Sequence, residues 1–354
     1  MPNGGKTGFF VHELRRRNHY DVTDEVFIAD PREVRAAVEA ILQAQSSDID
    51  LTPIQQAFDV FARLYSGELD DYLGCETWYH DAQHSLDCTL TLVRLVDGHE
   101  RSVATAERLG PRRSVLAVIL ALFHDAGYIR CRADPQQHGA EFTTWHVKRS
   151  GDFLAGLLPD LGFAEEAEAA RQMIHYTGYE LALDQIRVDD PRDRRLGFML
   201  GSADLLAQMS DRCYLEKCRD CLYPEFVLAG LAGEGQADTP FTSAEALIAS
   251  TPGFIDQIWA DRLDGYFESV HRHEATHFKG KTPYLHAIQA QRPRLEHAIG
   301  HAGIHDGLRR RAECVNAGPL RTLLGLDPTR APIPTSGHPP TPDGRERIDI
   351  HGAV

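Results

Sequence analysis

A short apolar run that ends in His124-Asp125 constrains the fold of this chain more than any other feature. Every residue from Val115 to Phe123 is apolar, and Pro111 suits the first turn of a helix. A helix without a polar face is buried in the protein, and this one is too short to span a bilayer. We expect its last turn to place the imidazole and the carboxylate in the interior, with Gly127 as a left-handed stop.

Burial of His124 and Asp125 is unfavourable unless another group compensates for it. A divalent cation would do so, because it binds imidazole and carboxylate ligands together. A simple hydrogen bond between the two side chains is the alternative. The remaining motifs help to decide between these two interpretations.

The composition excludes several classes of protein. The chain has 354 residues, 42% hydrophobic and 25% charged, which is typical of a soluble protein with one or two domains. Its formal net charge of −15 disfavours binding to nucleic acid or to an anionic membrane, so an anionic substrate would need a local positive centre. The N-terminal residues lack an apolar signal segment and the seven cysteines are an odd number, so we expect a cytoplasmic protein with reduced thiols.

Hydrophobic periodicity predicts helices along the chain and no convincing strand, which indicates an all-α fold. The helices expected after the N-terminal arm cover approximately residues 31–45, 52–64, 78–96, 111–125, 138–158, 164–177, 196–211, 244–249, 254–277 and 284–299, with a charged loop at 187–195. We divide the chain into an N-terminal arm and helix (1–50), a catalytic domain (51–300) and a C-terminal extension (301–354). The extension is rich in proline and expected to be disordered from about residue 327.

Two further stretches supply candidate ligands. His80 and His84 lie four residues apart at the start of a predicted helix, so both imidazoles would point to one side of it. Asp204 lies beside Leu205 and Leu206 in another predicted helix, where an acid is either a ligand or part of a solvated face.

Taken together, the candidate ligands are His84, His124, Asp125 and Asp204. Nitrogen and oxygen ligands without thiolate suit zinc, manganese, iron or magnesium better than a closed structural zinc site. Such an ion lowers the pKa of its bound water, and the resulting hydroxide can attack phosphorus. His80 lies one turn from His84, where it could protonate the leaving oxygen as a general acid.

These residues resemble the HD-domain superfamily of metal-dependent phosphohydrolases, and most closely its class I cyclic nucleotide phosphodiesterase branch. The segment Tyr79-His80-Asp81-Ala82-Gln83-His84 is similar to the YHNxxH motif of that branch, with Asp81 in place of asparagine. The pair His124-Asp125 matches the HD motif, and Asp204 in Ala203-Asp204-Leu205 matches the distal aspartate. The resemblance covers roughly residues 70–271. It implies an HD-domain helical bundle in which His80 donates a proton and the other four residues bind the metal.

The resemblance also implies roles for residues around the metal. Glu141 loosely matches a glutamate of the outer coordination sphere. His146 and His175 fall where other HD branches hold a second metal, although a buried structural role is the alternative for both. Phe254, in a segment similar to the family's GFID, would clamp the purine, and Tyr79 is a second expected substrate contact.

Two positions depart from the phosphodiesterase pattern. Thr251 stands where the family has its purine-reading glutamine, and Tyr128 replaces the histidine that follows the HD motif. The sequence therefore leaves open whether cyclic nucleotides are the substrates.

Two other motifs suggest different chemistry. His273-Glu274-Ala275-Thr276-His277 is a literal HExxH, which in metalloproteases binds zinc, but no clear third ligand follows it. Cys213, Cys218 and Cys221 have the spacing of the first three ligands of a plant-type ferredoxin, but they lie in a stretch that reads as helix. We expect neither group to bind metal.

The sequence thus predicts a phosphodiesterase or phosphomonoesterase that acts on a nucleotide-like or other small phosphate ester. It would use one or two divalent ions (zinc, manganese, iron or magnesium) and His80 as general acid. A catalytically silent HD-fold protein with a regulatory or ligand-binding role is the alternative. The intact ligand set and the presence of His80 argue against that alternative.

Overall fold

The computed structural model describes residues 16–301, except 234–238 and 240, together with residues 307 and 308. Over these ranges the regular secondary structure is helical, and no strand or sheet is formed. Two isolated β-bridges pair Tyr20 with Phe27 and Tyr72 with Cys131. The expected disorder from about residue 327 falls outside the described residues. The division of the chain at residues 50 and 300 stays a prediction.

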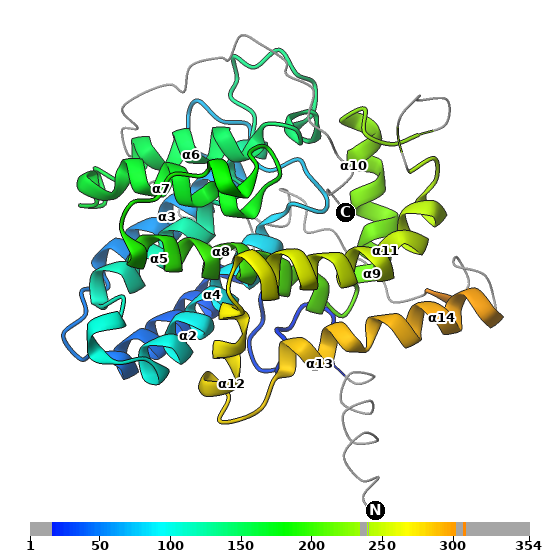
Figure 1. Cartoon of the computed structure of the whole chain (residues 1–354). Helices are drawn as coiled ribbons and strands as arrows, with labels where there is room; N and C mark the ends of the chain where they lie inside the picture. The colour runs from blue at the N-terminus through cyan, green and yellow to red at the C-terminus, as the bar shows by residue number, and fades with distance from the viewer. Residues whose placement is uncertain (1–15, 234–238, 240, 302–306, 309–354) are drawn as a thin grey trace, which may run out of the picture.

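Thirteen helices and several short 3₁₀ or π segments make up the described part of the chain (Figure 1). The helices are α2 (Pro31–Gln45), α3 (Thr52–Ser66), α4 (Ala82–Ser102), α5 (Pro111–Phe123), α6 (His146–Leu157), α7 (Ala167–Met173), α8 (Pro191–Ser210), α9 (Tyr214–Lys217), α10 (Tyr223–Leu228), α11 (Ala244–Ile258), α12 (Glu274–His277), α13 (Pro283–Gln289) and α14 (Gln291–His301). The short segments that matter below are η2 (Ala126–Tyr128), η3 (Gly139–Phe142), η5 (Ile174–Thr177), η8 (Trp259–Tyr266) and η9 (Val270–His273).

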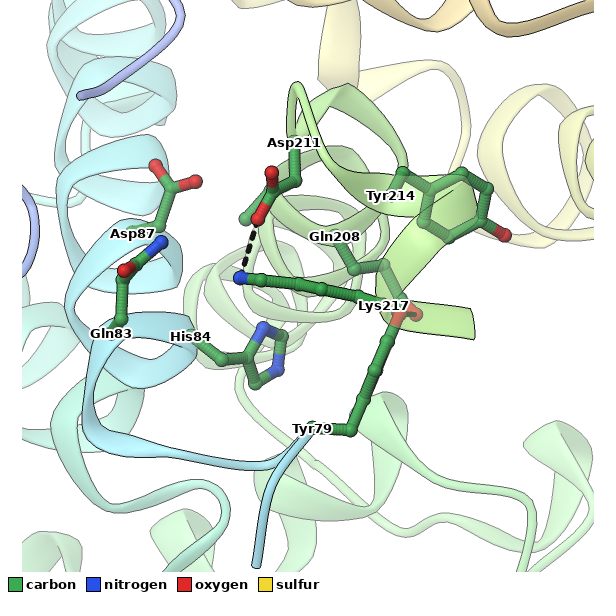
Figure 2. Close-up of a pocket in the computed structure, with 9 residues that line it drawn as sticks. Tyr79, Gln83, His84, Asp87, Gln208, Asp211, Tyr214 and Lys217 are labelled. Carbon is green, nitrogen blue, oxygen red and sulfur yellow. Dashed lines mark hydrogen bonds and ion pairs between the residues drawn. The ribbon is translucent and has the colours of Figure 1, made fainter. Parts of the chain in front are cut away.

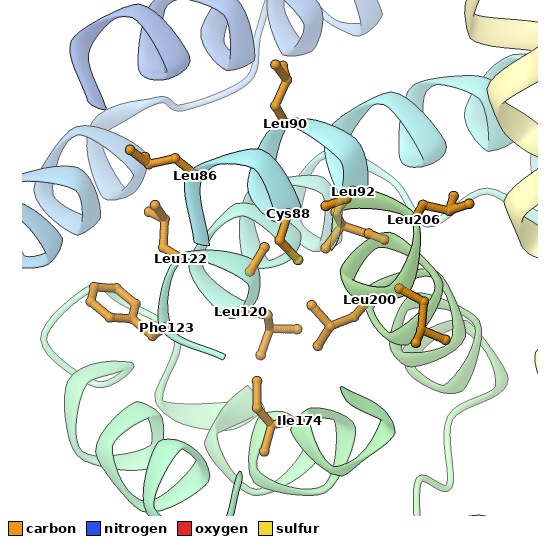
Figure 3. Close-up of a cluster of buried hydrophobic side chains, with 14 of the residues drawn as sticks. Leu86, Cys88, Leu90, Leu92, Leu120, Leu122, Phe123, Ile174, Leu200 and Leu206 are labelled. Atoms are coloured by element: carbon orange, nitrogen blue, oxygen red, sulfur yellow. The ribbon is translucent and has the colours of Figure 1, made fainter. Parts of the chain in front are cut away.

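Three helices, α4, α5 and α8, pack against one another at the centre of the fold. Leu92 of α4, Leu120 of α5 and Leu200 of α8 face the apolar space between these helices (Figure 3). Helix α5 is buried from residue 114 to its end, as its apolar sequence predicts. Burial of each such leucine contributes about 2 kcal/mol to folding.

Helix α4 is buried almost along its whole length, because α2, α5, α8 and α12 all pack against it. Its polar side chains therefore cannot reach bulk water and must find partners inside the protein. The first turn of α4 lies beside the end of α5, and this is where the candidate ligands gather.

The start of α4 differs from the prediction. The helix begins at Ala82, because the Asp81 carboxylate accepts a hydrogen bond from the His84 backbone N–H (2.9 Å) and caps it. His80 therefore precedes the helix, and the expectation that His80 and His84 share one helix face is wrong.

The end of α5 also differs. The helix stops at Phe123, and the chain continues through His124 and Asp125 into η2. Gly127 is not left-handed, so the predicted stop signal is wrong. The glycine is needed for close packing instead, since a Cβ atom there would lie 1.9 Å from the His146 carbonyl oxygen.

Three more expectations about helix boundaries failed. Helix α8 begins at Pro191, capped by Asp190, whereas residues 187–195 were expected to form a loop. Helix α11 runs through Pro252 to Ile258, although a break was expected at that proline. Apolar side chains on both sides of Pro252, such as Ile248 and Phe254, are buried, and their packing outweighs the hydrogen bond that proline cannot donate. The long helix expected over 254–277 is instead divided among the end of α11, η8, η9 and α12.

Candidate metal centre

Four side chains from the three central helices converge at one point. His84 comes from the first turn of α4, His124 and Asp125 follow the last turn of α5, and Asp204 lies in the middle of α8. All four side chains are buried. The structure therefore brings together the four residues that the sequence predicts as ligands.

The nitrogen and oxygen atoms of this cluster face one another. His84 Nε2 lies 3.3 Å from His124 Nε2, 3.1 Å from Asp204 Oδ1 and 3.4 Å from Asp125 Oδ2. His124 Nε2 lies 3.2 Å from Asp125 Oδ2 and 3.6 Å from Asp204 Oδ1. The ligand atoms of His84, His124 and Asp204 all lie within 4.8 Å of one another.

The chemistry of these atoms fits a divalent cation. His124 Nδ1 donates to the Ala121 carbonyl oxygen (2.8 Å), which leaves the lone pair of the neutral ring on Nε2, facing the cluster. Among the described residues, Asp125 Oδ2 is buried without a hydrogen-bond partner. One cation would bind these lone pairs at about 2.0–2.2 Å after small side-chain shifts. The ligand types alone do not select one metal.

The electrostatics of the cluster also favour a positive charge. Burial alone would raise the pKa of Asp204, but hydrogen bonds with His124 and His84 lower it below its usual value. Burial alone would lower the pKa of His124, but Asp125 and Asp204 raise it well above its usual value. The two carboxylates therefore favour a positive charge at this point, which a bound cation would supply.

His80 lies beside the cluster and is bound to a residue that the sequence analysis missed. Its Nδ1 donates to Glu225 Oε2 (2.7 Å), and Glu225 is buried in α10. Glu225 Oε1 accepts from the backbone N–H groups of Trp78 (2.5 Å) and Tyr79 (2.6 Å). Burial lowers the pKa of His80, but the charge and hydrogen bond of Glu225 outweigh this effect and raise it.

The other nitrogen of His80, Nε2, lies 3.5 Å from the Tyr128 hydroxyl. The centres of the His80 and His84 rings are 6.1 Å apart. His80 is thus close to the cluster without being part of it, which suits a proton donor better than a ligand.

His146 also borders the cluster. Its Nδ1 donates to the Thr143 carbonyl oxygen (2.8 Å), and its Nε2 lies 3.7 Å from Asp125 Oδ1. Burial lowers the pKa of His146 to about 4, so its ring is neutral and Nε2 carries a lone pair. No group of three described ligand residues includes His146, so a second metal stays a prediction.

The remaining outer candidates have other surroundings. His175 is buried in η5, and burial lowers its pKa, with smaller effects from the charges of Asp152 and Lys148. The Glu141 carboxylate accepts from the backbone N–H groups of Gln137 (2.7 Å) and His138 (2.9 Å) and so caps η3.

A small cavity lies between α4, α8 and α9 and has His84 on its wall (Figure 2). The other residues that line it are Tyr79, Gln83, Asp87, Ala207, Gln208, Asp211, Tyr214 and Lys217. Lys217 Nζ forms an ion pair with Asp211 Oδ2 (2.6 Å). Asp87 is buried, its Oδ1 has no hydrogen-bond partner in the described part of the chain, and burial raises its pKa to about 7.

The predicted substrate contacts are only partly near this cavity. Tyr79 lines it, and its hydroxyl donates to Gln208 Oε1 (3.1 Å). Phe254 belongs to the apolar core and does not line the cavity. Thr251 is buried, with its hydroxyl directed to the Leu247 carbonyl oxygen (3.4 Å).

Neither alternative motif brings three ligand atoms within 4.8 Å of one another in the described part of the chain. His277 Nδ1 donates to Asp97 Oδ2 (2.7 Å), His273 Nδ1 lies 3.1 Å from the Ser102 hydroxyl, and Glu274 accepts from the Tyr284 N–H (3.1 Å). Both histidines are half-buried. The cysteines at 213, 218 and 221 are buried and form no disulfide within the described residues.

A scan of known protein families finds no model that matches this chain, and a search of curated protein sequences finds no match either. Within the described residues, no helix is both long enough and apolar enough to cross a membrane.

Proposed function

We propose that this chain is a metal-dependent phosphohydrolase of HD-domain type. The observation that carries the proposal is the buried His84–His124–Asp204 group, joined by Asp125, with His80 next to it and held by Glu225. Its substrate would be a nucleotide-like or other small phosphate ester, cleaved as a monoester or a diester.

The residues divide into two functions. His84, His124, Asp125 and Asp204 would hold the cation, which when bound offsets charge on phosphorus and makes water more acidic. His80 holds a proton on Nε2 and gives it to the leaving oxygen. Glu225 stabilises the protonated ring through Nδ1, so the proton that is transferred is the one on Nε2.

Metal analysis and a substrate panel test the proposal. The purified chain is stripped of metal, titrated with zinc, manganese, iron(II) or magnesium, and assayed with an aryl phosphate, a bis-aryl phosphate diester, 5′-nucleotides and 3′,5′-cyclic nucleotides. We expect about one tightly bound ion per chain and metal-dependent hydrolysis of at least one ester. Asp204→Asn should lose both the ion and the activity.

Asp97→Asn is the matched control, because Asp97 is also a buried carboxylate paired with a histidine, but it lies in the later part of α4 and its partner is His277 of the HExxH motif. It should keep both metal and activity. Metal binding without hydrolysis of any ester would favour the catalytically silent alternative. Hydrolysis that survives Asp204→Asn would contradict the proposed site.

A further inference from the structure

Tyr128, the residue that departs from the family pattern after the HD motif, lies against two histidines. Its ring is parallel to that of His80, with the centres 4.3 Å apart and the planes at 17°. It also stacks on His146 at 4.2 Å and 23°. Tyr128 is almost completely buried, so this arrangement belongs to the interior and not to a mobile surface.

The backbone around Tyr128 leaves the ring little freedom. Residue 128 ends η2, which packs tightly on α6 because Gly127 has no side chain. On the other side Gly139 contacts the Tyr128 carbonyl group, and a Cβ atom at Gly139 would lie 2.4 Å from that oxygen. Two glycines thus allow the backbone to hold Tyr128 from both sides.

The hydrogen bond between His80 and Glu225 does not by itself determine where His80 Nε2 points. It fixes the position of Nδ1, but the imidazole can still tilt about the line of that bond. A flat ring packed against one face of the imidazole removes this remaining freedom. Glu225 and Tyr128 together therefore define both the position and the plane of the His80 ring.

We propose that Tyr128 is a positioning residue that keeps His80 Nε2 directed toward the metal centre. The proposal rests on the proposed role of His80 as general acid. It assigns the effect to the face of the aromatic ring, since the hydroxyl of Tyr128 is 3.5 Å from Nε2, at the limit of a hydrogen bond.

Two substitutions separate the ring from the hydroxyl. Tyr128→Phe keeps the stacked ring and should stay within about 3-fold of the wild-type rate, whereas Tyr128→Leu should lose about 10- to 100-fold on an alkyl phosphate ester. An aryl phosphate needs little protonation of its leaving group, so its hydrolysis by Tyr128→Leu should change little. Metal content should be unchanged in both variants.

A double-mutant cycle with His80→Ala decides whether the effect acts through His80. Once His80 is absent, Tyr128→Leu should cause no further loss on the alkyl ester. Tyr72→Leu is the control for loss of a buried tyrosine ring, because Tyr72 packs on Phe153 and has no described contact with His80. It should affect the two esters equally.

A measurement that needs no substrate keeps this proposal separate from the proposed function. In ¹⁵N-histidine NMR spectra, the His80 Nδ1–H signal should persist in all variants, because Glu225 holds it. The His80 Nε2–H signal should be present in the wild type and in Tyr128→Phe, and broadened or lost in Tyr128→Leu. Retention of that signal in Tyr128→Leu, or equal damage to both esters, would overturn the role of Tyr128. Absence of any hydrolysis by the wild type, with the NMR result as expected, would instead count against the proposed function.

Discussion

Glu225→Gln changes the charge next to His80 while keeping the shape of the side chain. Glu225 is fully buried, and its hydrogen bond to His80 Nδ1 is 2.7 Å long. A hydrogen bond to a charged group contributes about 1.5–3 kcal/mol, which corresponds to about one to two pKa units. Glutamine keeps part of this interaction, so we expect the pKa of His80 to fall by about one unit.

The direction of the effect on activity follows from the role of His80. A general acid must be protonated, so kcat/KM decreases as the pH rises through the pKa of His80. Glu225 raises this pKa, and Glu225→Gln should therefore move the decrease to lower pH by about one unit. The rate at pH values well below both pKa values should change much less.

The assay is a pH profile of kcat/KM with an alkyl phosphate ester, at saturating metal, for the wild type and two variants. Asp97→Asn is the control, since the bond from Asp97 to His277 has the same length of 2.7 Å and Asp97 is equally buried. Its profile should match that of the wild type. An unchanged profile in Glu225→Gln, or a loss of metal from that variant, would refute the assignment of Glu225 to His80.

Two further predictions concern other residues of the centre and its surroundings. His84→Ala should lose both metal and activity. His80→Ala should keep its metal, and its rate should fall about 10²–10⁴-fold on an alkyl ester but much less on an aryl ester. Metal analysis and assays with the two esters check this, and loss of metal from His80→Ala would show that His80 is a ligand. Asp87 has a raised pKa of about 7 in the folded chain, so it stabilises the fold below its unfolded pKa and loses this contribution as the pH rises toward 7. Urea unfolding at pH 5 and pH 8 measures how far the free energy of unfolding falls between these pH values. This fall should be smaller by about 3 kcal/mol in Asp87→Asn than in the wild type. An equal fall in both proteins would contradict the raised pKa.

The parts of the fold that the sequence predicted depend on local signals. Helix α2 has its Asp30 cap and Pro31 next to an apolar stripe, and α5 is apolar on every side. The convergence of His84, His124 and Asp204 was also predicted, from the ligand chemistry of these side chains and from the resemblance to the HD motif pattern, and the structure brings the three together. The roles of these residues in binding and catalysis stay proposals.

The failures at Gly127 and Pro252 have a common cause. Both residues were read as local stop signals, from their backbone preferences alone. In the structure, Gly127 is required by the approach of α6, and Pro252 is tolerated because α11 packs its apolar side chains on both sides of it. Tertiary packing overrides the local preference in each case.

Glu225 shows most clearly why the candidate site could not be completed from the sequence. It lies 145 residues from His80, and nothing in the surrounding Leu222-Tyr-Pro-Glu-Phe226 distinguishes it from an exposed acid in a first helical turn. Its burial is favourable because three hydrogen bonds converge on its two oxygens, and two of them come from backbone N–H groups that precede α4. Since α4 begins only at Ala82, those N–H groups are not used within a helix, and Glu225 satisfies them. The helix begins later than predicted, and the backbone N–H groups that this late start leaves outside the helix are the ones that hold the Glu225 carboxylate beside His80.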